Sequence, residues 1–242
     1  MKILAIDSSG QVATVALIED SECVAEYSIN YKKTHSQTLL PMLEEIRKMV
    51  GLDLPSIDAI AVAAGPGSFT GLRIGSATAK GLGQALNKPI IPVPTVDGLA
   101  FNLYGSDKLI CPLMDARRNQ TYTGLYRFQR AGEELKLEVL EPQCAVALEE
   151  IIQKINEINS EVIFLGDGVS VFREQIREQV KVPFTFAPAC CNRQRAAAVG
   201  TLALEYMKLG KAEAAEKHQP EYLRLSQAER ERKEEMQRGH HN

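Results

Sequence analysis

This chain is organised around the segment Asp58-Ala-Ile-Ala-Val-Ala-Ala-Gly65-Pro-Gly-Ser-Phe-Thr-Gly-Leu-Arg-Ile-Gly75. The run from Ile57 to Ala64 is short and apolar, which is typical of a strand buried on both faces of a sheet. Gly65-Pro66-Gly67 ends that strand, and Ser68 or Thr70 can then cap a helix, because apolar residues recur at helical spacing after them. The segment therefore predicts a strand, a tight turn and a helix.

The predicted helix carries a regular series of small residues. They recur every four positions and so share one face: Gly71, Gly75, Ala79 and Gly83. Each interior glycine costs a helix about 1 kcal/mol relative to alanine, so close approach of another backbone must offset the loss. We expect this face to pack against a partner's helix. The alternative is packing on a neighbouring helix of the same chain.

Residues 65–75, followed by Ala77-Thr-Ala-Lys-Gly81, resemble the signature of the TsaB family, partner proteins in the bacterial machinery that makes threonylcarbamoyl adenosine in tRNA. Further pieces extend the resemblance along most of the chain: IDSS at 6–9, HSQTLLP at 35–41, MDARR at 114–118, GDG at 166–168 and PEYLR at 220–224. The residues after Ser226 lie outside it.

Composition restricts the class of function. The 242 residues, 45% of them hydrophobic, are enough for one large domain or two small ones. The 28 basic residues are outnumbered by 31 acidic ones, so no global basic field exists to hold RNA by counterion release. Direct, tight binding of tRNA by this chain alone is therefore disfavoured, and a local basic patch at Arg117 and Arg118 stays open.

The first residues and the cysteines predict an ordinary cytoplasmic protein. Asp7 interrupts the initial apolar run before it reaches the length of a signal peptide, and no later stretch approaches a membrane span. Five irregularly spaced cysteines form neither a disulfide framework nor a paired metal-binding motif. Buried free thiols are expected, with redox activity of the adjacent pair Cys190-Cys191 as the minor alternative.

The chain contains an internal duplication. A meander of three strands is predicted at 2–6, 12–18 and 24–29, and again at 109–114, 121–128 and 135–140. Asp7 and Asp115 end the first strand of each meander. Helices are expected at 35–50, from Val96, and at 147–158, 169–180 and 195–209, with strands at 90–94 and 162–165. We take the repeated plan as a duplication.

This plan predicts the duplicated actin-like ATPase fold, an α/β fold of the ribonuclease H-like kind, and the TsaB resemblance implies the same fold. Each subdomain is expected to hold a mixed sheet that begins with the meander. We place the N-terminal subdomain at 1–106, the C-terminal subdomain at 107–226, and a charged, disordered tail at 227–242.

Actin-like kinases hold ATP between two turns equivalent to those at Asp7 and Asp115, with magnesium-bound water oriented by the aspartates. Here Asp115-Ala-Arg-Arg118 has no glycine, so nucleotide binding is expected to be weak and vestigial. The candidate residues are Asp7, Ser8, Ser9, Asp115, Arg117, Gly166 and Gly168. In the structural alternative both aspartates cap their own turns, and residues 166–168 form a simple strand-to-helix turn.

Motifs of other catalytic classes are missing. The catalytic paralogue, TsaD, holds a metal ion with two histidines four apart, whereas here Leu39 follows His35 at that spacing. We expect no metal site, because the other histidines are His218 and the tail pair. Residues 65–71 also lack the third glycine of a dinucleotide fingerprint, the lysine of a P-loop and the elbow of a serine hydrolase. No catalytic residue is assigned.

We therefore expect a non-catalytic partner or scaffold subunit that docks on a TsaD-type paralogue and supports threonylcarbamoyl transfer to the adenosine beside the anticodon. The resemblance implies docking through the helices from His35 and Gly71, and self-association there when the partner is absent. The expected interface residues are His35, Leu39, Leu40, Leu43, Leu72, Arg73, Gly75, Ser76 and Ala79. Gly75→Arg is expected to abolish association and leave the fold largely intact.

The other expected partners are a TsaE-type ATPase and, through the complex, tRNA, with no membrane. No intrinsic cofactor is expected, and ATP or ADP with magnesium is placed at or near the subunit interface. Two other classes stay open. An ATP-dependent kinase or ATPase would need Asp7 and Asp115, and a zinc peptidase would need a bound metal.

Overall fold

The computed structural model describes residues 1–31 and 34–224, which form two five-stranded mixed sheets. The first sheet has the order β3-β2-β1-β4-β5, from β1 (Lys2–Asp7), β2 (Ala13–Glu19), β3 (Glu22–Ile29), β4 (Ala59–Gly65) and β5 (Ile90–Pro94). The second has the order β10-β9-β6-β7-β8, from β6 (Leu109–Asp115), β7 (Gln120–Ala131), β8 (Glu134–Ala147), β9 (Val162–Leu165) and β10 (Phe184–Phe186).

The two sheets repeat one plan. β1 pairs antiparallel with β2 and parallel with β4, and β6 pairs in the same way with β7 and β9. Asp7 and Asp115 are the last residues of β1 and β6. The duplicated actin-like α/β fold predicted from the sequence is therefore confirmed. The short strand β10 was not predicted, because its three residues are too few to show a periodic pattern.

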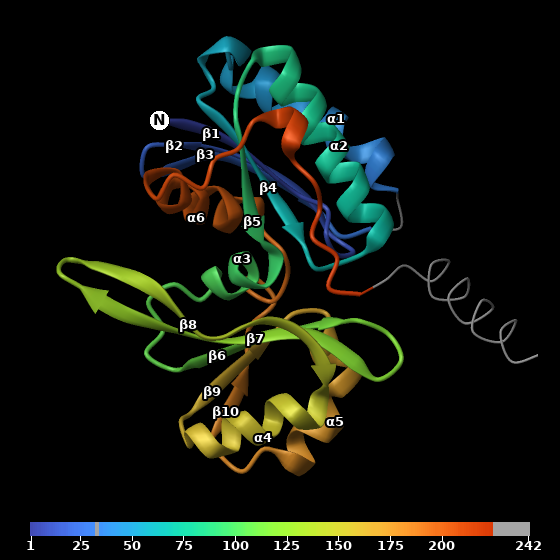
Figure 1. Cartoon of the computed structure of the whole chain (residues 1–242), viewed down its shortest axis with the longest axis vertical. Helices are drawn as coiled ribbons and strands as arrows, with labels where there is room; N and C mark the ends of the chain where they lie inside the picture. The colour runs from blue at the N-terminus through green and yellow to red at the C-terminus, as the bar shows by residue number, and fades with distance from the viewer. Residues whose placement is uncertain (32–33, 225–242) are drawn as a thin grey trace, which may run out of the picture.

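The helices cover both sheets (Figure 1). They are α1 (His35–Val50), α2 (Phe69–Leu86), α3 (Thr95–Phe101), α4 (Leu148–Ile158), α5 (Gly168–Gln179) and α6 (Ala196–Lys208), with short 3₁₀ turns η1 (Leu54–Ser56) and η2 (Ala215–Lys217). α1 and α2 lie side by side on the first sheet, and α4 and α5 lie on the second (Figure 1). Among the described residues, no helix combines the length and apolarity needed to cross a membrane.

The last helix returns to the first sheet. α6 packs on β1 and β2 so closely that a Cβ on Gly200 would lie 2.6 Å from Cγ1 of Ile18. The Ala196 amide donates to the Thr14 hydroxyl at 3.2 Å, which fixes the start of the helix on β2. The division at residues 106 and 107 stays a prediction, and the tail at 227–242 lies outside the described residues.

A buried carboxylate joins the two halves. Asp97 of α3 accepts hydrogen bonds from the hydroxyls of Tyr126 in β7, at 2.8 Å, and Tyr206 in α6, at 2.9 Å. Burial raises the pKa of Asp97, because the charged form loses its hydration, and the two tyrosine hydrogen bonds oppose that rise. The carboxylate therefore fixes the second sheet and α6 on the same point of α3.

The small-residue ridge of α2 faces the interior of this chain. A Cβ on Gly71 would lie 2.1 Å from the Ser8 carbonyl oxygen, and one on Gly75 would lie 2.4 Å from Ser8 Oγ. A Cβ on Gly83 would lie 2.7 Å from Cβ of Ala215 in η2. The ridge thus accommodates the turn after β1. The ridge therefore packs within its own chain, and its contact with a partner's helix stays a prediction. A side chain at residue 75 would displace Ser8, so Gly75→Arg is not a variant that spares the fold.

The predicted interface residues, those of the ridge included, fall into a buried group and an exposed group. Six are buried within the chain, namely Leu39, Leu43, Leu72, Gly75, Ser76 and Ala79. His35 is half-buried, and its Nε2 lies 2.9 Å from the Gly10 carbonyl oxygen. Leu40 and Arg73 are exposed. Their contact with any partner stays a prediction.

Candidate functional site

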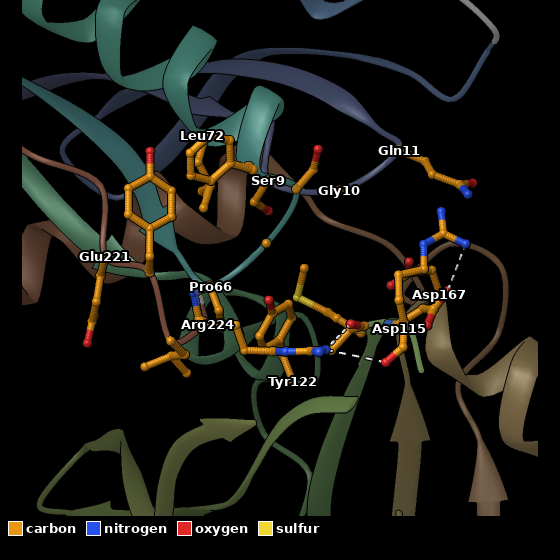
Figure 2. Close-up of a pocket in the computed structure, with 18 residues that line it drawn as sticks. Ser9, Gly10, Gln11, Pro66, Leu72, Asp115, Tyr122, Asp167, Glu221 and Arg224 are labelled. Carbon is orange, nitrogen blue, oxygen red and sulfur yellow. Dashed lines mark hydrogen bonds and ion pairs between the residues drawn. The ribbon is translucent and has the colours of Figure 1, made fainter. Parts of the chain in front are cut away.

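A cavity of about 330 Å³ lies between the two sheets, where β1 and β6 end (Figure 2). The β1–β2 turn, the start of α2, the β6–β7 turn and the C-terminal segment 221–224 line it. Among the predicted cofactor residues, Ser9, Asp115 and Arg117 face the cavity, whereas Asp7, Ser8, Gly166 and Gly168 are not part of its lining. The fold therefore brings the two predicted turns together, as an actin-like plan requires.

The turn after β1 uses its polar groups internally. Oδ1 of Asp7 accepts hydrogen bonds from the Ser9 amide at 2.8 Å and the Ser9 hydroxyl at 2.6 Å. The Ser8 hydroxyl donates to the Gly71 carbonyl oxygen at 2.8 Å. Complete burial raises the pKa of Asp7 to about 6, although the hydrogen bonds from Ser9 favour the ionised form. The hydroxyls of Ser8 and Ser9 are thus already bonded within the protein.

The turn after β6 has the same self-capping geometry. Oδ1 of Asp115 accepts a hydrogen bond from the Arg117 amide at 2.8 Å, and Oδ2 lies 3.3 Å from Nη1 of Arg117. Arg117, Arg118 and Asn119 all have left-handed backbone, with φ of +64°, +55° and +58°. The guanidinium of Arg224 donates to the carbonyl oxygens of Ala116 and Arg117 (Figure 2). In both turns the geometry is that of the structural alternative.

The C-terminal segment forms one wall of the cavity. It descends along α2 toward the cavity (Figure 1), and the Glu221 amide donates to the Ala64 carbonyl oxygen at 2.7 Å. Gly65, at φ +126°, permits this approach, because a Cβ there would lie 2.1 Å from the Glu221 carbonyl oxygen. The Tyr222 ring lies 4.8 Å from that of Phe69. The place of the PEYLR motif in the fold was not predicted, and Gly65 is the sequence feature that indicates a close backbone contact there.

The turn at residues 166–168 packs against β6. Gly166 has φ +104°, and a Cβ there would lie 2.1 Å from the Leu113 carbonyl oxygen. Between the glycines, Asp167 lines the cavity, and its Oδ1 is buried without a hydrogen-bond partner. Burial raises the pKa of Asp167, and the Arg193 guanidinium opposes the rise. Close packing therefore explains both glycines, and Asp167 is a cavity residue that was not predicted from the sequence.

These groups do not fit a magnesium nucleotide held as a kinase holds it. The Ser8 and Ser9 hydroxyls are engaged, and Arg224 lies against the Asp115 turn. Phosphate binding in such turns needs free amides, glycines and hydroxyls. Within residues 1–31 and 34–224, no three His, Cys, Asp or Glu side chains converge so that they could hold a metal ion. The arrangement of these groups therefore does not support phosphoryl transfer in this cavity.

A second surface lies on the side of α1 and α2 that points away from the sheet. We call it the outer α1–α2 face and define it by exposed residues of both helices, Leu40, Arg73, Ala77 and Gly81. Leu40 is 56% exposed. A Cβ on Gly81 would meet no atom within 4 Å, so this glycine serves no packing need inside the chain.

The fold and the cavity define an actin-like α/β protein whose phosphate-binding turns are filled by its own side chains. Residues 22–232 match the model of the family "TsaD: tRNA N6-adenosine threonylcarbamoyltransferase". The chain is 35% identical to "tRNA threonylcarbamoyladenosine biosynthesis protein TsaB" of Bacillus subtilis (strain 168), over 95% of this chain and 96% of that protein. The chain belongs to the TsaB family.

More distant relatives agree. The TsaB protein of Escherichia coli (strain K12) is 31% identical over 69% of this chain and 72% of its own length. The solved structure "YeaZ from Pseudomonas aeruginosa" is 26% identical, superposes with a TM-score of 0.76, and is matched over 92% of this chain and 99% of that one. The likeness therefore extends through both halves of the fold.

Proposed function

We propose that this chain is a non-catalytic subunit of the complex that forms threonylcarbamoyladenosine in tRNA. It docks on a TsaD-type catalytic paralogue and supports threonylcarbamoyl transfer to the adenosine beside the anticodon. The assignment to this pathway is supported by the names of its curated relatives from Bacillus subtilis and Escherichia coli. The complex acts in the cytoplasm.

The observation that carries the non-catalytic role is the state of the two turns. Asp7 is buried and bonded to Ser9, and Asp115 is bonded to the Arg117 backbone and side chain. A catalytic carboxylate must reach substrate or bound metal. Asp7 is buried outside the cavity lining, and Asp115, which faces the cavity, has one oxygen bonded to the Arg117 amide and the other 3.3 Å from its guanidinium. An actin-like kinase or ATPase is the alternative that this geometry disfavours.

The outer α1–α2 face is the docking surface in this proposal. Ala77 and Gly81 are exposed one helical turn apart, so a partner's helix could approach α2 closely there. Leu40 adds exposed apolar area on the neighbouring helix. The proposed interface therefore lies on the same two helices as the one inferred from the sequence. Its small residues are now Ala77 and Gly81, on the side of α2 opposite the buried ridge.

The proposal includes the other partners that the family resemblance implies. A TsaE-type ATPase and tRNA join through the complex, and a homodimer forms through the same face when the paralogue is absent. ATP or ADP with magnesium is placed at or near the subunit interface, because the cavity of this chain offers too few free phosphate ligands.

The docking test replaces two exposed small residues by arginine. Ala77→Arg and Gly81→Arg should each weaken binding to the TsaD-type protein at least 100-fold, since a long cationic side chain prevents close helix approach. Val171→Arg is the matched control, because Val171 is 58% exposed on α5 in the other half of the chain. Circular dichroism and the unfolding midpoint should match those of wild type. Unchanged affinity of both α2 variants would place the interface elsewhere.

The catalytic alternative is tested by a reconstituted assay of tRNA modification. The chain is omitted, added as wild type, or added as Asp115→Asn, a change at the partly exposed edge of the cavity. Loss of product on omission and full recovery with Asp115→Asn support an obligatory, non-catalytic subunit. Recovery by wild type alone, with the variant folded and bound to its partner, would favour the kinase or ATPase.

A further inference from the structure

The loop between β10 and α6 carries a pair of adjacent cysteines that the proposed function does not use. Cys190 is exposed and Cys191 is partly buried, and their Sγ atoms lie 3.6 Å apart. Both are free thiols. We propose that Cys190 and Cys191 form a reversible redox pair, oxidised to a disulfide by a low-molecular-weight disulfide and returned to the dithiol by small thiols.

Exposure sets the order of the two steps. Burial and the neighbouring Cys190 sulfur raise the pKa of the Cys191 thiol, so Cys190 is the residue that meets an external disulfide first. The Cys190 thiolate attacks one sulfur of the small disulfide, forms a mixed disulfide and releases one small thiolate. The Cys191 thiolate then attacks Sγ of Cys190 and releases the second. Two protein thiols are oxidised, one small disulfide is reduced, and the two protons pass to the small thiolates.

Backbone geometry makes the product easy to reduce. Neighbouring Cα atoms are about 3.8 Å apart across a trans peptide, whereas disulfides usually join Cα atoms about 4.4 to 6.8 Å apart. A disulfide between residues 190 and 191 is therefore strained. Strained and exposed disulfides have more oxidising potentials and are the labile, regulatory ones.

The loop also contacts two turns beside the cavity, the β1–β2 turn and the turn at residues 166–168, so oxidation of the cysteines is coupled to the cavity. Oδ1 of Asn192 accepts a hydrogen bond from the Gly166 amide at 2.7 Å. On the other side, Nε2 of Gln194 lies 2.7 Å from the position that a Cβ on Gly10 would take. Both amide atoms of Gln194 are buried without hydrogen-bond partners, which is unfavourable. The loop backbone is held from the other side by the Asn102 side chain, whose Nδ2 donates to the carbonyl oxygens of Cys191 at 3.2 Å and Arg193 at 2.6 Å.

Closing the disulfide must move this backbone. The two Sγ atoms start 3.6 Å apart, and the S–S bond length is about 2 Å. Since Asn192 follows Cys191 directly, the shift weakens its bond to Gly166 and loosens the turn that holds Asp167 in the cavity.

The test uses the full-length chain and oxidised glutathione. After reaction, free thiols are blocked with an alkylating agent and the protein is digested with trypsin. Cleavage after Lys181 and Arg193 releases one peptide, VPFTFAPACCNR, which contains both cysteines. The expected product is this peptide two hydrogens lighter and without alkyl groups, restored to the dialkylated form by prior treatment with reduced glutathione.

Serine variants separate this reaction from ordinary glutathionylation. Cys191→Ser should retain glutathione on Cys190, whereas wild type should release it. A stable mixed disulfide on wild-type Cys190, as in Cys191→Ser, would overturn the redox pair.

Hydrogen–deuterium exchange of the Gly166 amide should accelerate at least fivefold on oxidation of wild type and stay unchanged in the double serine variant. An unchanged rate in the oxidised wild type would overturn the coupling to the cavity.

Discussion

Two glycines of the same helix should respond in opposite ways to alanine. Gly81 is exposed on α2, and a Cβ there meets nothing within 4 Å, so Gly81→Ala removes a helix penalty of about 1 kcal/mol without cost. Gly71 lies on the buried ridge, where the new Cβ would lie 2.1 Å from the Ser8 carbonyl oxygen. Because that neighbour is backbone, the turn or the helix must shift.

Shifts of this kind typically cost about 1 to 3 kcal/mol, and here the Ser8 hydroxyl would also lose its hydrogen bond to the Gly71 carbonyl oxygen. We therefore expect Gly71→Ala to lower the free energy of unfolding by more than about 2 kcal/mol and Gly81→Ala to raise it by up to about 1 kcal/mol. For a chain of this size, 1 kcal/mol corresponds to about 2 to 4 °C in Tm.

The assay is urea unfolding followed by circular dichroism, with thermal scans as a second measurement. Equal m-values for wild type and variants would show that the difference lies in stability and not in the extent of unfolding. A Gly71→Ala protein as stable as wild type would refute the inward orientation of the ridge. In that case the face from Gly71 to Gly83 would again be a candidate for a partner's helix.

Further predictions concern the buried carboxylates and the C-terminal segment. The pKa of Asp7 is raised to about 6 from an ordinary value of 3.8, so its protonation stabilises the fold below pH 4 and this contribution is lost as pH rises through 6. In urea unfolding, wild type should therefore gain up to about 3 kcal/mol of unfolding free energy relative to Asp7→Asn between pH 7.5 and pH 4. Parallel pH profiles of the two proteins would contradict this. Asp97→Ala leaves two buried tyrosine hydroxyls without their acceptor and should cost about 2 to 4 kcal/mol of unfolding free energy, against about 1 kcal/mol for Tyr206→Phe. A loss for Asp97→Ala no larger than that for Tyr206→Phe would contradict a separate contribution of the Tyr126 bond. Arg224→Ala should accelerate limited tryptic cleavage after Arg117 several-fold, because it removes the guanidinium that binds the β6–β7 turn, and an unchanged rate would mean that the turn holds its shape alone.

Much of the fold was predictable because its signals are local. The apolar period places α1 at His35–Val50, and the left-handed Gly51 ends it, so these bounds follow from a short window of sequence. The paired meanders predicted the duplication and placed Asp7 and Asp115 in equivalent turns. β10 was missed, since a three-residue strand has no period to detect.

The candidate site was only partly predictable, because its decisive contacts join distant parts of the chain. The sequence pointed to Asp115 and Arg117 but gave no sign that Arg224 binds the same turn. Nor does any spacing show that Asp167 has a buried, unpaired oxygen in the cavity. Side chains from separate elements meet there only after both sheets have formed.

The sequence by itself determined the duplicated α/β plan, the strand, turn and helix of residues 57–86, and the fact that Gly71, Gly75, Ala79 and Gly83 share a face. Periodicity fixes which residues share a face, but it carries no information about what covers that face. Tertiary structure decided that the turn at Ser8 covers Gly71 and Gly75 and that Ala215 of η2 covers Gly83. A missing side chain accommodates any close backbone, whether from a partner or from the same chain, so only the packed structure distinguishes the two.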